Sequence, residues 1–194
     1  SYPACIIVEE ETGADESERD SFLKRLSSVL ESDLAVDAVV AESDTQARGI
    51  WSLRDGVTEA ISRAGLTHKF DVTVPPAAMP GFLDQMEAFG EEAGELRTLL
   101  FGHLGDGNIH VNMMQMPGLS QAAFYAKGPA LAERIYGHVA KLHGSISAEH
   151  GIGIAKRGYL HHSRSTEEVD LMRGVKHLLD PDCMLNPGVL FESN

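Results

Sequence analysis

Apolar residues recur along the chain with two different spacings, which predict a mixture of strands and helices. Short alternating or continuous apolar runs indicate strands, whereas apolar residues three and four positions apart indicate helices that bury one face. Strands are predicted over His68–Val74, Thr98–Leu104, Ile109–Met114 and Ser145–Ser147, and helices over Asp15–Glu31, Thr45–Ala64, Pro80–Gly94, Ser120–His143 and Thr166–Leu179.

Two further strands are predicted near the beginning of the chain. Tyr2–Glu9 has an apolar stretch of strand type, and Val36–Ala41 is a short apolar run of strand length. Because the chain starts with Ser1 and enters a strand pattern at once, we expect it to be a piece of a longer protein.

The order of these elements predicts an α+β protein. Strands and helices that alternate, with a hairpin between two of the strands, are typical of a ferredoxin-like α+β sandwich with a mainly antiparallel sheet. A duplicated version of this arrangement stays open. No repeat, low-complexity tract or linker marks an internal boundary, so we expect one domain over residues 1–194.

The charge balance narrows the set of partners. Lys and Arg number 16 and Asp and Glu number 29, which leaves a formal net charge of −13. Nucleic acids and anionic membranes are bound through clustered Lys and Arg, so neither is an expected partner. If the substrate is an anion, a few local cations must hold it.

The cysteines and the apolar runs bear on location. Cys5 and Cys183 lie far apart and form no metal or redox spacing, so a reducing cytoplasm fits best. No apolar run approaches the roughly 20 residues that cross a bilayer, and no targeting leader opens the chain. We therefore expect a cytoplasmic location and no transmembrane segment.

A hairpin offers the first candidate chemistry. The turn residues Gly105–Asn108 separate two predicted strands, with His103 just before the turn and His110 just after it. Residues His110 and Asn112 share a face of their strand, and cross-strand neighbours about 5 Å apart could join His103 to them. Two imidazoles on one rigid hairpin can form half of a metal site. They can also be ordinary polar residues of a half-exposed sheet.

A second segment, Ser147–Gly153, places Glu149 and His150 side by side between small residues. Glu149 is a suitable third ligand for a metal that keeps a position open for substrate. His150 could act as a general base, because the unperturbed pKa of histidine lies near working pH. The alternative is a loop whose Glu and His cap a neighbouring helix.

These residues resemble a known family, the C-terminal domain of FAD-linked oxidases of the D-lactate dehydrogenase, glycolate oxidase FAD subunit and D-2-hydroxyglutarate dehydrogenase type. The resemblance rests on Gly102–Asn112, on Ser147–Gly153 followed by Lys156, and on Leu185–Gly188. These motifs stand in the family's order and span nearly the whole chain. The first two are highly specific together, whereas the closing one alone is weak.

The resemblance implies a role for each matching residue. His103, His110 and Glu149 would bind a divalent metal, with zinc as the expected ion, while Asn112 would lie beside the substrate and His150 would be the base. Upstream, Arg54, Thr58 and Lys69 would bind a substrate carboxylate, with Arg54 and Thr58 one helical turn apart. Asn186 would contact the flavin.

The resemblance also implies an activity. The chain would be the substrate- and metal-binding domain of an FAD-dependent dehydrogenase that oxidises a D-2-hydroxy acid to the 2-oxo acid. D-2-hydroxyglutarate is favoured, because three carboxylate-binding residues suit a substrate with two carboxylates, while D-lactate and glycolate stay open. No Gly-rich phosphate loop occurs here, so FAD would be held mainly by a domain outside this chain, without which the fragment would be inactive.

Two other classes of function compete with this interpretation. One is a free-standing module that binds a metal or a hydroxy acid and has no redox activity. The other is a metal-dependent hydrolase that uses His150 with a metal-bound water. Binding without a flavin partner would favour the first, and turnover of an ester or amide without flavin would favour the second. The electron acceptor is not predicted.

Overall fold

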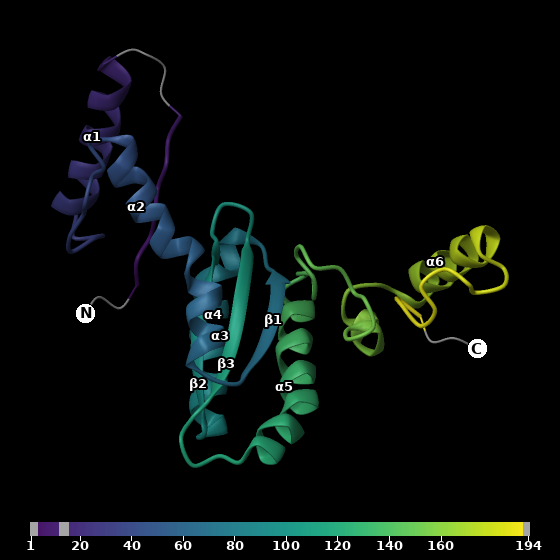
Figure 1. Cartoon of the computed structure of the whole chain (residues 1–194). Coiled ribbons are helices and arrows are strands. Elements are labelled where there is room, and N and C mark those ends of the chain that lie inside the picture. The colour runs from purple at the N-terminus through teal and green to yellow at the C-terminus, as the bar shows by residue number, and fades with distance from the viewer. Residues whose placement is uncertain (1–3, 12–15, 192–194) are drawn as a thin grey trace. The chain divides into compact units, whose positions relative to one another are not determined.

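The computed structural model of the 194-residue chain describes residues 4–11 and 16–191 (Figure 1). The chain divides into two compact units, Ser1–Arg63 and Ala64–Asn194. In the second unit, helices pack against an antiparallel sheet, which confirms the predicted α+β class. None of the helices in the described ranges is long and apolar enough to cross a membrane.

The first part of the chain is helical. Helix α1 covers Glu16–Glu31, α2 covers Asp44–Asp55 and α3 covers Val57–Ala64. The single helix predicted over Thr45–Ala64 is therefore divided at Gly56. The Gly56 N–H still donates to the Ser52 carbonyl at 3.1 Å, so the helical path continues through the break.

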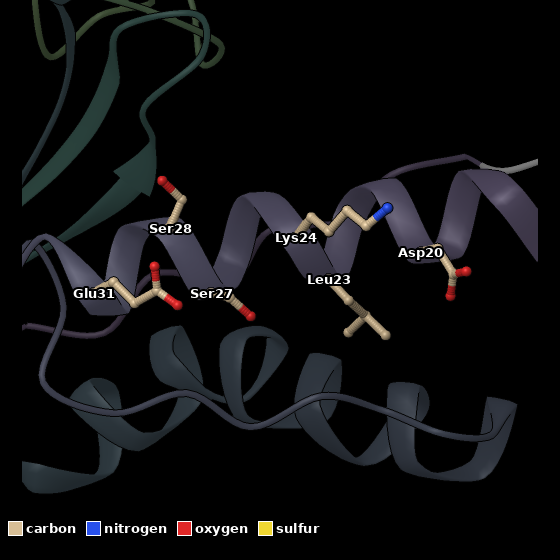
Figure 2. A pocket seen from close by; sticks show the side chains of 6 residues that line it. All are labelled: Asp20, Leu23, Lys24, Ser27, Ser28 and Glu31. Carbon is tan, nitrogen blue, oxygen red and sulfur yellow. The ribbon is translucent and has the colours of Figure 1, made fainter.

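A shallow groove follows α1 and is lined by residues of this helix alone (Figure 2). Leu23 is half-buried, whereas the other lining residues are exposed. The groove contains no histidine or cysteine and none of the residues predicted to bind substrate or metal. The full lining is Asp20, Leu23, Lys24, Ser27, Ser28 and Glu31.

The two strands predicted near the beginning of the chain are wrong. Residues 4–9 and 37–41 have no strand or helix assignment, and the first residues of the Tyr2–Glu9 prediction lie outside the described part of the chain. A strand is stabilised by hydrogen bonds to a neighbouring strand. An apolar run alone does not supply that neighbour.

The second unit is built on a three-stranded antiparallel sheet with the order β1-β3-β2. Strand β1 covers Thr67–Thr73, β2 covers Leu96–His103 and β3 covers Asn108–Gln115. An isolated antiparallel bridge between Thr73 and Ser145 continues this order beyond β1. The predicted short strand over Ser145–Ser147 is thus reduced to one bridge, and the order matches one copy of a ferredoxin-like arrangement.

Two helices cover one face of this sheet. Helix α4, Met79–Ala93, follows a short 3-10 turn, η1 at Pro76–Ala78, and contacts β2, while α5, Gln121–Lys141, contacts β1 (Figure 1). Alternate strand residues and the apolar sides of both helices form a single core. It includes Phe70, Val72, Ile109, Val111 and Met113 from the sheet, Phe82 and Met86 from α4, and Phe124, Leu131, Ile135 and Val139 from α5.

Glycine allows the imidazole of His68 to reach α5. The His68 ring stacks on Phe124 with centroids 4.1 Å apart, and its Nε2 lies 2.9 Å from the Phe124 carbonyl oxygen. A Cβ on Gly128 would come within 2.8 Å of the His68 Cε1 atom, which is closer than real Cβ contacts allow. The absence of a side chain on Gly128 therefore leaves room for the His68 ring.

The last part of the chain contains a 3-10 helix, η2 at Arg157–His162, and helix α6 at Thr166–Leu179. The α6 bounds equal the predicted ones, because a reciprocal capping box between Ser165 and Glu168 fixes its start. In η2, the side chain of Leu160 is buried, and η2 packs against α5.

Candidate active site

The sheet face opposite the core carries the polar residues. In the strand register, Lys69 pairs with Asn112, Asp71 pairs with His110, and His110 also pairs with Phe101. Directly paired residues of antiparallel strands project to the same face. Four predicted or newly identified site residues, Lys69, Asp71, His110 and Asn112, therefore share one surface of β1 and β3.

Hydrogen bonds to Asp71 hold the segment that contains Glu149 and His150 against this face. Its Oδ2 atom accepts hydrogen bonds from the backbone N–H groups of Glu149, at 2.9 Å, and His150, at 3.0 Å. The N–H of Ala148 donates to the Asp71 carbonyl at 3.3 Å. Residues far apart in the sequence are thus joined at one strand position, and Asp71 itself is only 3% exposed.

Further hydrogen bonds hold the same segment. Ser147 Oγ donates to the Gly151 carbonyl at 2.8 Å and accepts from Lys156 Nζ at 3.0 Å. Lys156 Nζ also donates to the Asp71 carbonyl at 3.4 Å. The motif from Ser147 to Lys156 is therefore a loop closed on itself and on β1.

Both imidazoles of the site approach the Asp71 carboxylate. His110 Nδ1 lies 3.6 Å from Asp71 Oδ1, and His150 Nδ1 lies 3.6 Å from Oδ2. The two rings are 5.9 Å apart, and the His110 ring is also 4.8 Å from Phe101. Asp71 Oδ1 is buried and has no hydrogen-bond partner among the described residues.

The surroundings of Asp71 favour its ionised form. Burial alone would raise the pKa of this carboxyl, but the backbone N–H groups of Glu149 and His150, with the nearby His150 and Lys156, lower the pKa below its usual 3.8. Burial lowers the pKa of Lys156, and the Asp71 charge opposes this shift. Burial raises the pKa of Tyr136 to about 12, so this phenol stays neutral.

The donor set of this face fits a divalent metal. Asp71, His110 and Glu149 each offer one ligand atom, and these atoms lie within 4.8 Å of one another. Imidazole nitrogen together with carboxylate oxygen is a donor set of the zinc type. The ligand set that the family resemblance implies does not include Asp71. In that set the buried Oδ1 of Asp71, 3.6 Å from His110 Nδ1, would instead accept the Nδ1 proton of a metal-bound His110, as carboxylates commonly do behind histidine ligands.

Comparison with known proteins identifies the family. The pattern described as FAD linked oxidases, C-terminal domain, matches residues 3–190. The chain belongs to this family. It is 41% identical over its full length to a D-2-hydroxyglutarate dehydrogenase of Xanthomonas citri pv. viticola, of which it covers 41%. It is 37% identical over 80% of its length to one from Stutzerimonas stutzeri, of which it covers 34%.

A plant relative gives the same relation. The chain is 38% identical over 93% of its length to the mitochondrial D-2-hydroxyglutarate dehydrogenase of Arabidopsis thaliana, and covers 31% of it. The chain therefore spans less than half the length of each of these three relatives. The family match confirms an FAD-linked oxidase domain and does not favour the free-standing module.

Of the three ligands that the family resemblance implies, the structure brings two together directly. His110 and Glu149 lie with Asp71, whereas the donor group described above does not include His103. His103 is exposed at the end of β2, two residues beyond Phe101 and so on the same face as His110. Its role as a ligand stays a prediction.

The predicted carboxylate-binding residues fall in both units. Arg54, in the last turn of α2, is half-buried, and Thr58 in α3 is exposed. Lys69 is exposed on β1 of the second unit. Asn112 is 3% exposed, and its amide donates to the carbonyls of Leu99, at 3.4 Å, and His110, at 3.2 Å.

The C-terminal motif is tied to the loop with Glu149. Arg157 Nη1 donates to the Gly188 carbonyl at 2.7 Å, and the N–H of Leu190 donates to the Gly153 carbonyl at 3.0 Å. Asn186 is exposed beside this connection, with a positive φ of 48°. Gly153 and Gly188, the last residues of the two family motifs, are thus each hydrogen-bonded to a residue that follows the other motif.

Sequence reasoning missed Asp71. Aspartate is depleted in strand interiors, and Asp71 stands between Phe70 and Val72 in a strand whose alternate residues are apolar. An aspartate in the interior of a predicted strand was therefore the sequence signal that could have identified Asp71. Sequence reasoning also missed Asn108, which is 3% exposed and whose side-chain amide has no hydrogen-bond partner among the described residues.

Proposed function

We propose that this chain is the substrate-binding domain of an FAD-dependent dehydrogenase that oxidises a D-2-hydroxy acid to the 2-oxo acid. D-2-hydroxyglutarate is the favoured substrate, followed by D-lactate and glycolate. A domain outside this chain would hold most of the FAD. Family membership supports the reaction class, and the names of the relatives support the choice of substrate.

The observation that carries the proposal is the meeting of three residues at Asp71. His110, Glu149 and His150 come from two motifs distant in the sequence. The Asp71 carboxylate lies 3.6 Å from Nδ1 of both histidines and accepts hydrogen bonds from the backbone N–H groups of Glu149 and His150. These contacts support the proposal that metal ligands and a base lie together beside this face of the sheet. This is what activation of a hydroxyl group requires.

We assign the metal to His103, His110 and Glu149, with zinc as the expected ion and Asp71 as the residue that orients His110. When bound, the metal supplies polarisation of the substrate hydroxyl, and FAD supplies the acceptor for the hydride. Asn186 is the proposed flavin contact within this chain. These assignments rest on the donor chemistry and the family motifs.

His150 is the proposed base. Its side chain is 64% exposed, which leaves it accessible to a substrate, and its Nδ1 faces the Asp71 carboxylate at 3.6 Å. A proton on Nδ1 directed at Asp71 leaves the Nε2 lone pair available. Nε2 would take the proton of the substrate hydroxyl as the α-carbon loses a hydride to the flavin, so the substrate gives up two hydrogens, one as a proton and one as a hydride that carries both electrons.

The remaining residues would position the substrate. Arg54, Thr58 and Lys69 would bind its carboxylates, as the family motifs imply, since Arg and Lys supply the cations that carboxylates need in an otherwise acidic chain. Asn112 would lie beside the hydroxy-acid end. A second carboxylate on the substrate would use this set fully, which is why D-2-hydroxyglutarate is favoured over D-lactate.

The proposal is tested by titrating the zinc-loaded chain with D-2-hydroxyglutarate by calorimetry, beside the L enantiomer. We expect the D acid to bind more tightly, His177→Ala to match the parent, and His110→Ala to lose the preference. His177 is an exposed α6 residue outside the site, so it is a matched control. Equal binding by all three proteins would contradict the assignment of this face.

The redox role needs a separate measurement. In an FAD-containing enzyme that includes this chain, His150→Gln should lower turnover by about 100-fold or more, because a general base contributes on that order. Flavin reduction by D-2-hydroxyglutarate, followed by its absorbance, reports this step. Unchanged reduction in the variant would remove His150 from the role of base.

A cytoplasmic location is also proposed. It rests on Cys5 and Cys183, which are exposed free thiols, since exposed thiols persist in reducing compartments. The Arabidopsis relative is named as mitochondrial, and the bacterial relatives have no compartment in their names. Labelling of both thiols in intact cells, compared with secreted markers, tests the proposal.

A further inference from the structure

A second group of metal-type donors lies outside the site described above. Glu133 on α5 and the adjacent His161 and His162 at the end of η2 each offer one ligand atom, and these atoms lie within 4.8 Å of one another. None of these three belongs to the motifs shared with the oxidase family that were quoted above. Their arrangement depends on the packing of η2 against α5.

That packing is well anchored. Leu160 of η2 is 6% exposed, and the neighbouring Tyr159 ring meets the buried Tyr136 ring of α5 with centroids 5.1 Å apart. Just beyond η2, Ser163 Oγ accepts a hydrogen bond from the N–H of Ile146 at 2.9 Å. The two histidines therefore sit on a segment whose position is set by the core.

Hydrogen bonding leaves a nitrogen of His161 suited to a metal. Its Nδ1 lies 3.1 Å from the Gly158 carbonyl oxygen, and a carbonyl can only accept, so Nδ1 carries the proton. Nε2 then has the lone pair. A histidine ligand whose other nitrogen donates to a backbone carbonyl is the common arrangement in metal sites.

The other two donors already contact each other. His162 Nε2 donates a hydrogen bond to Glu133 Oε1 at 3.1 Å, so an ion bound between these two atoms would replace the Nε2 proton. The His161 and His162 rings are 4.1 Å apart. Nitrogen ligands about 2.0–2.1 Å from a tetrahedral zinc are closer together than 4.8 Å, so a small rotation of side chains is needed. Glu133 and His161 are exposed and have room to rotate.

We propose that Glu133, His161 and His162 form a second binding site for a divalent transition metal. It is independent of the proposed metal site of His103, His110 and Glu149, which we call the sheet-face site. Two imidazoles and one carboxylate select ions of the Zn²⁺ type over Mg²⁺ or Ca²⁺, which prefer oxygen ligands. An ion here cross-links α5 to η2. Since η2 follows directly after the loop with Glu149 and His150, the cross-link stabilises the end of that loop.

The test is a calorimetric titration of the chelator-treated 194-residue chain with ZnCl₂, in which His110→Ala removes the sheet-face site. We expect this variant to bind one equivalent of zinc, and the added change His161→Ala to weaken that binding by at least about tenfold. Adding Glu133→Gln instead should weaken it in the same direction. Adding His177→Ala, which alters an exposed histidine of α6, should have no effect.

A second readout separates binding from simple loss of folding. Zinc should raise the melting temperature of His110→Ala, because a ligand that binds only the folded state stabilises it, and should not raise that of His110→Ala/His161→Ala. Circular dichroism without zinc should be the same for both. The proposal is overturned if His110→Ala binds no zinc, or if its binding and thermal shift survive both His161→Ala and Glu133→Gln.

Discussion

The two faces of the β1-β3-β2 sheet are made from alternate residues of the same strands, yet one is apolar and the other carries polar residues. One face places Phe70, Val72 and Val111 in a core closed by α4 and α5. The other places Asp71 and His110 beside the loop of Glu149 and His150. Successive side chains of a strand point to opposite faces, so each residue of the polar face stands between two residues whose side chains point toward the core.

The two faces therefore have different roles: the apolar face mainly determines the stability of the fold, and the polar face carries the proposed chemistry. Burial of apolar side chains against α4 and α5 stabilises the fold, and the amount depends on the area removed from water. The proposed metal binding on the polar face depends instead on the positions of a few atoms, such as the Asp71 oxygens. Changes on the two faces should therefore be seen by different measurements.

The largest effect is expected on the apolar face. Phe82 of α4 is fully buried against the sheet, so Phe82→Ala should lower the free energy of unfolding by about 3–5 kcal/mol through lost burial and a cavity. Urea denaturation followed by circular dichroism measures this. Leu178→Ala is the control, because Leu178 is 80% exposed and its loss should change stability by at most about 0.5 kcal/mol.

The comparison would break if Phe82→Ala also weakened zinc binding at the sheet face. Measured well below its melting temperature, the variant should keep the zinc affinity of the parent. A loss as large as that in His110→Ala would mean that the two faces are not separable.

A smaller effect is expected from Asp71→Asn on the polar face. The amide oxygen can still accept the N–H groups of Glu149 and His150, but the charge facing His110 is lost. We expect zinc to bind this face about 10–100-fold more weakly, which is about 1.4–2.7 kcal/mol. A calorimetric titration in the His161→Ala background isolates this site.

Asp84→Asn provides the matched control, since Asp84 is an exposed carboxylate of α4. Hydrogen exchange of the Glu149 and His150 amides should be similar in Asp71→Asn and the parent. If zinc binding did not change while these amides became unprotected, Asp71 would be holding the loop only.

The smallest effect concerns a region outside both faces. Asp180 accepts from Lys176 Nζ and from the N–H groups of Met184 and Leu185, at 2.9 and 3.0 Å. Lys176 and these N–H groups lower the pKa of Asp180 below its usual 3.8. A lowered pKa in the folded state stabilises the fold above the unfolded value, and this stabilisation is lost as pH falls through the lower folded value.

Hydrogen exchange measured at decreasing pH checks this expectation. After correction for the intrinsic exchange rate, the Met184 and Leu185 amides should lose protection below about pH 4. Asp180→Asn should remove this pH dependence. The Val111 amide in β3 should keep its protection over the same range, and simultaneous loss at both places would mean that acid opens the whole unit.

Local signals were enough for most of the second unit. The capping box at Ser165 and the turn between β2 and β3 act within a few residues, so periodicity and turn chemistry located α6 and the hairpin. The predicted strands over Tyr2–Glu9 and Val36–Ala41 failed because pairing is a tertiary property. Gly56 divided a helix whose pattern looked continuous.

The site was less accessible to sequence reasoning. The histidines and Glu149 stand in recognisable motifs, but the contact of Asp71 with the loop joins positions that only the fold brings together. The Glu133–His162 contact likewise depends on how η2 lies against α5. Neither contact leaves a spacing in the sequence that a local pattern could detect.

The fit of His68 against Gly128 has an evolutionary consequence. A side chain at position 128 would collide with the imidazole, so a chain that gained one should also replace residue 68 by something smaller. The two positions should then vary together among homologues, although neither one carries the proposed chemistry. Such joint variation in an alignment would indicate that β1 and α5 lie close together at these two positions.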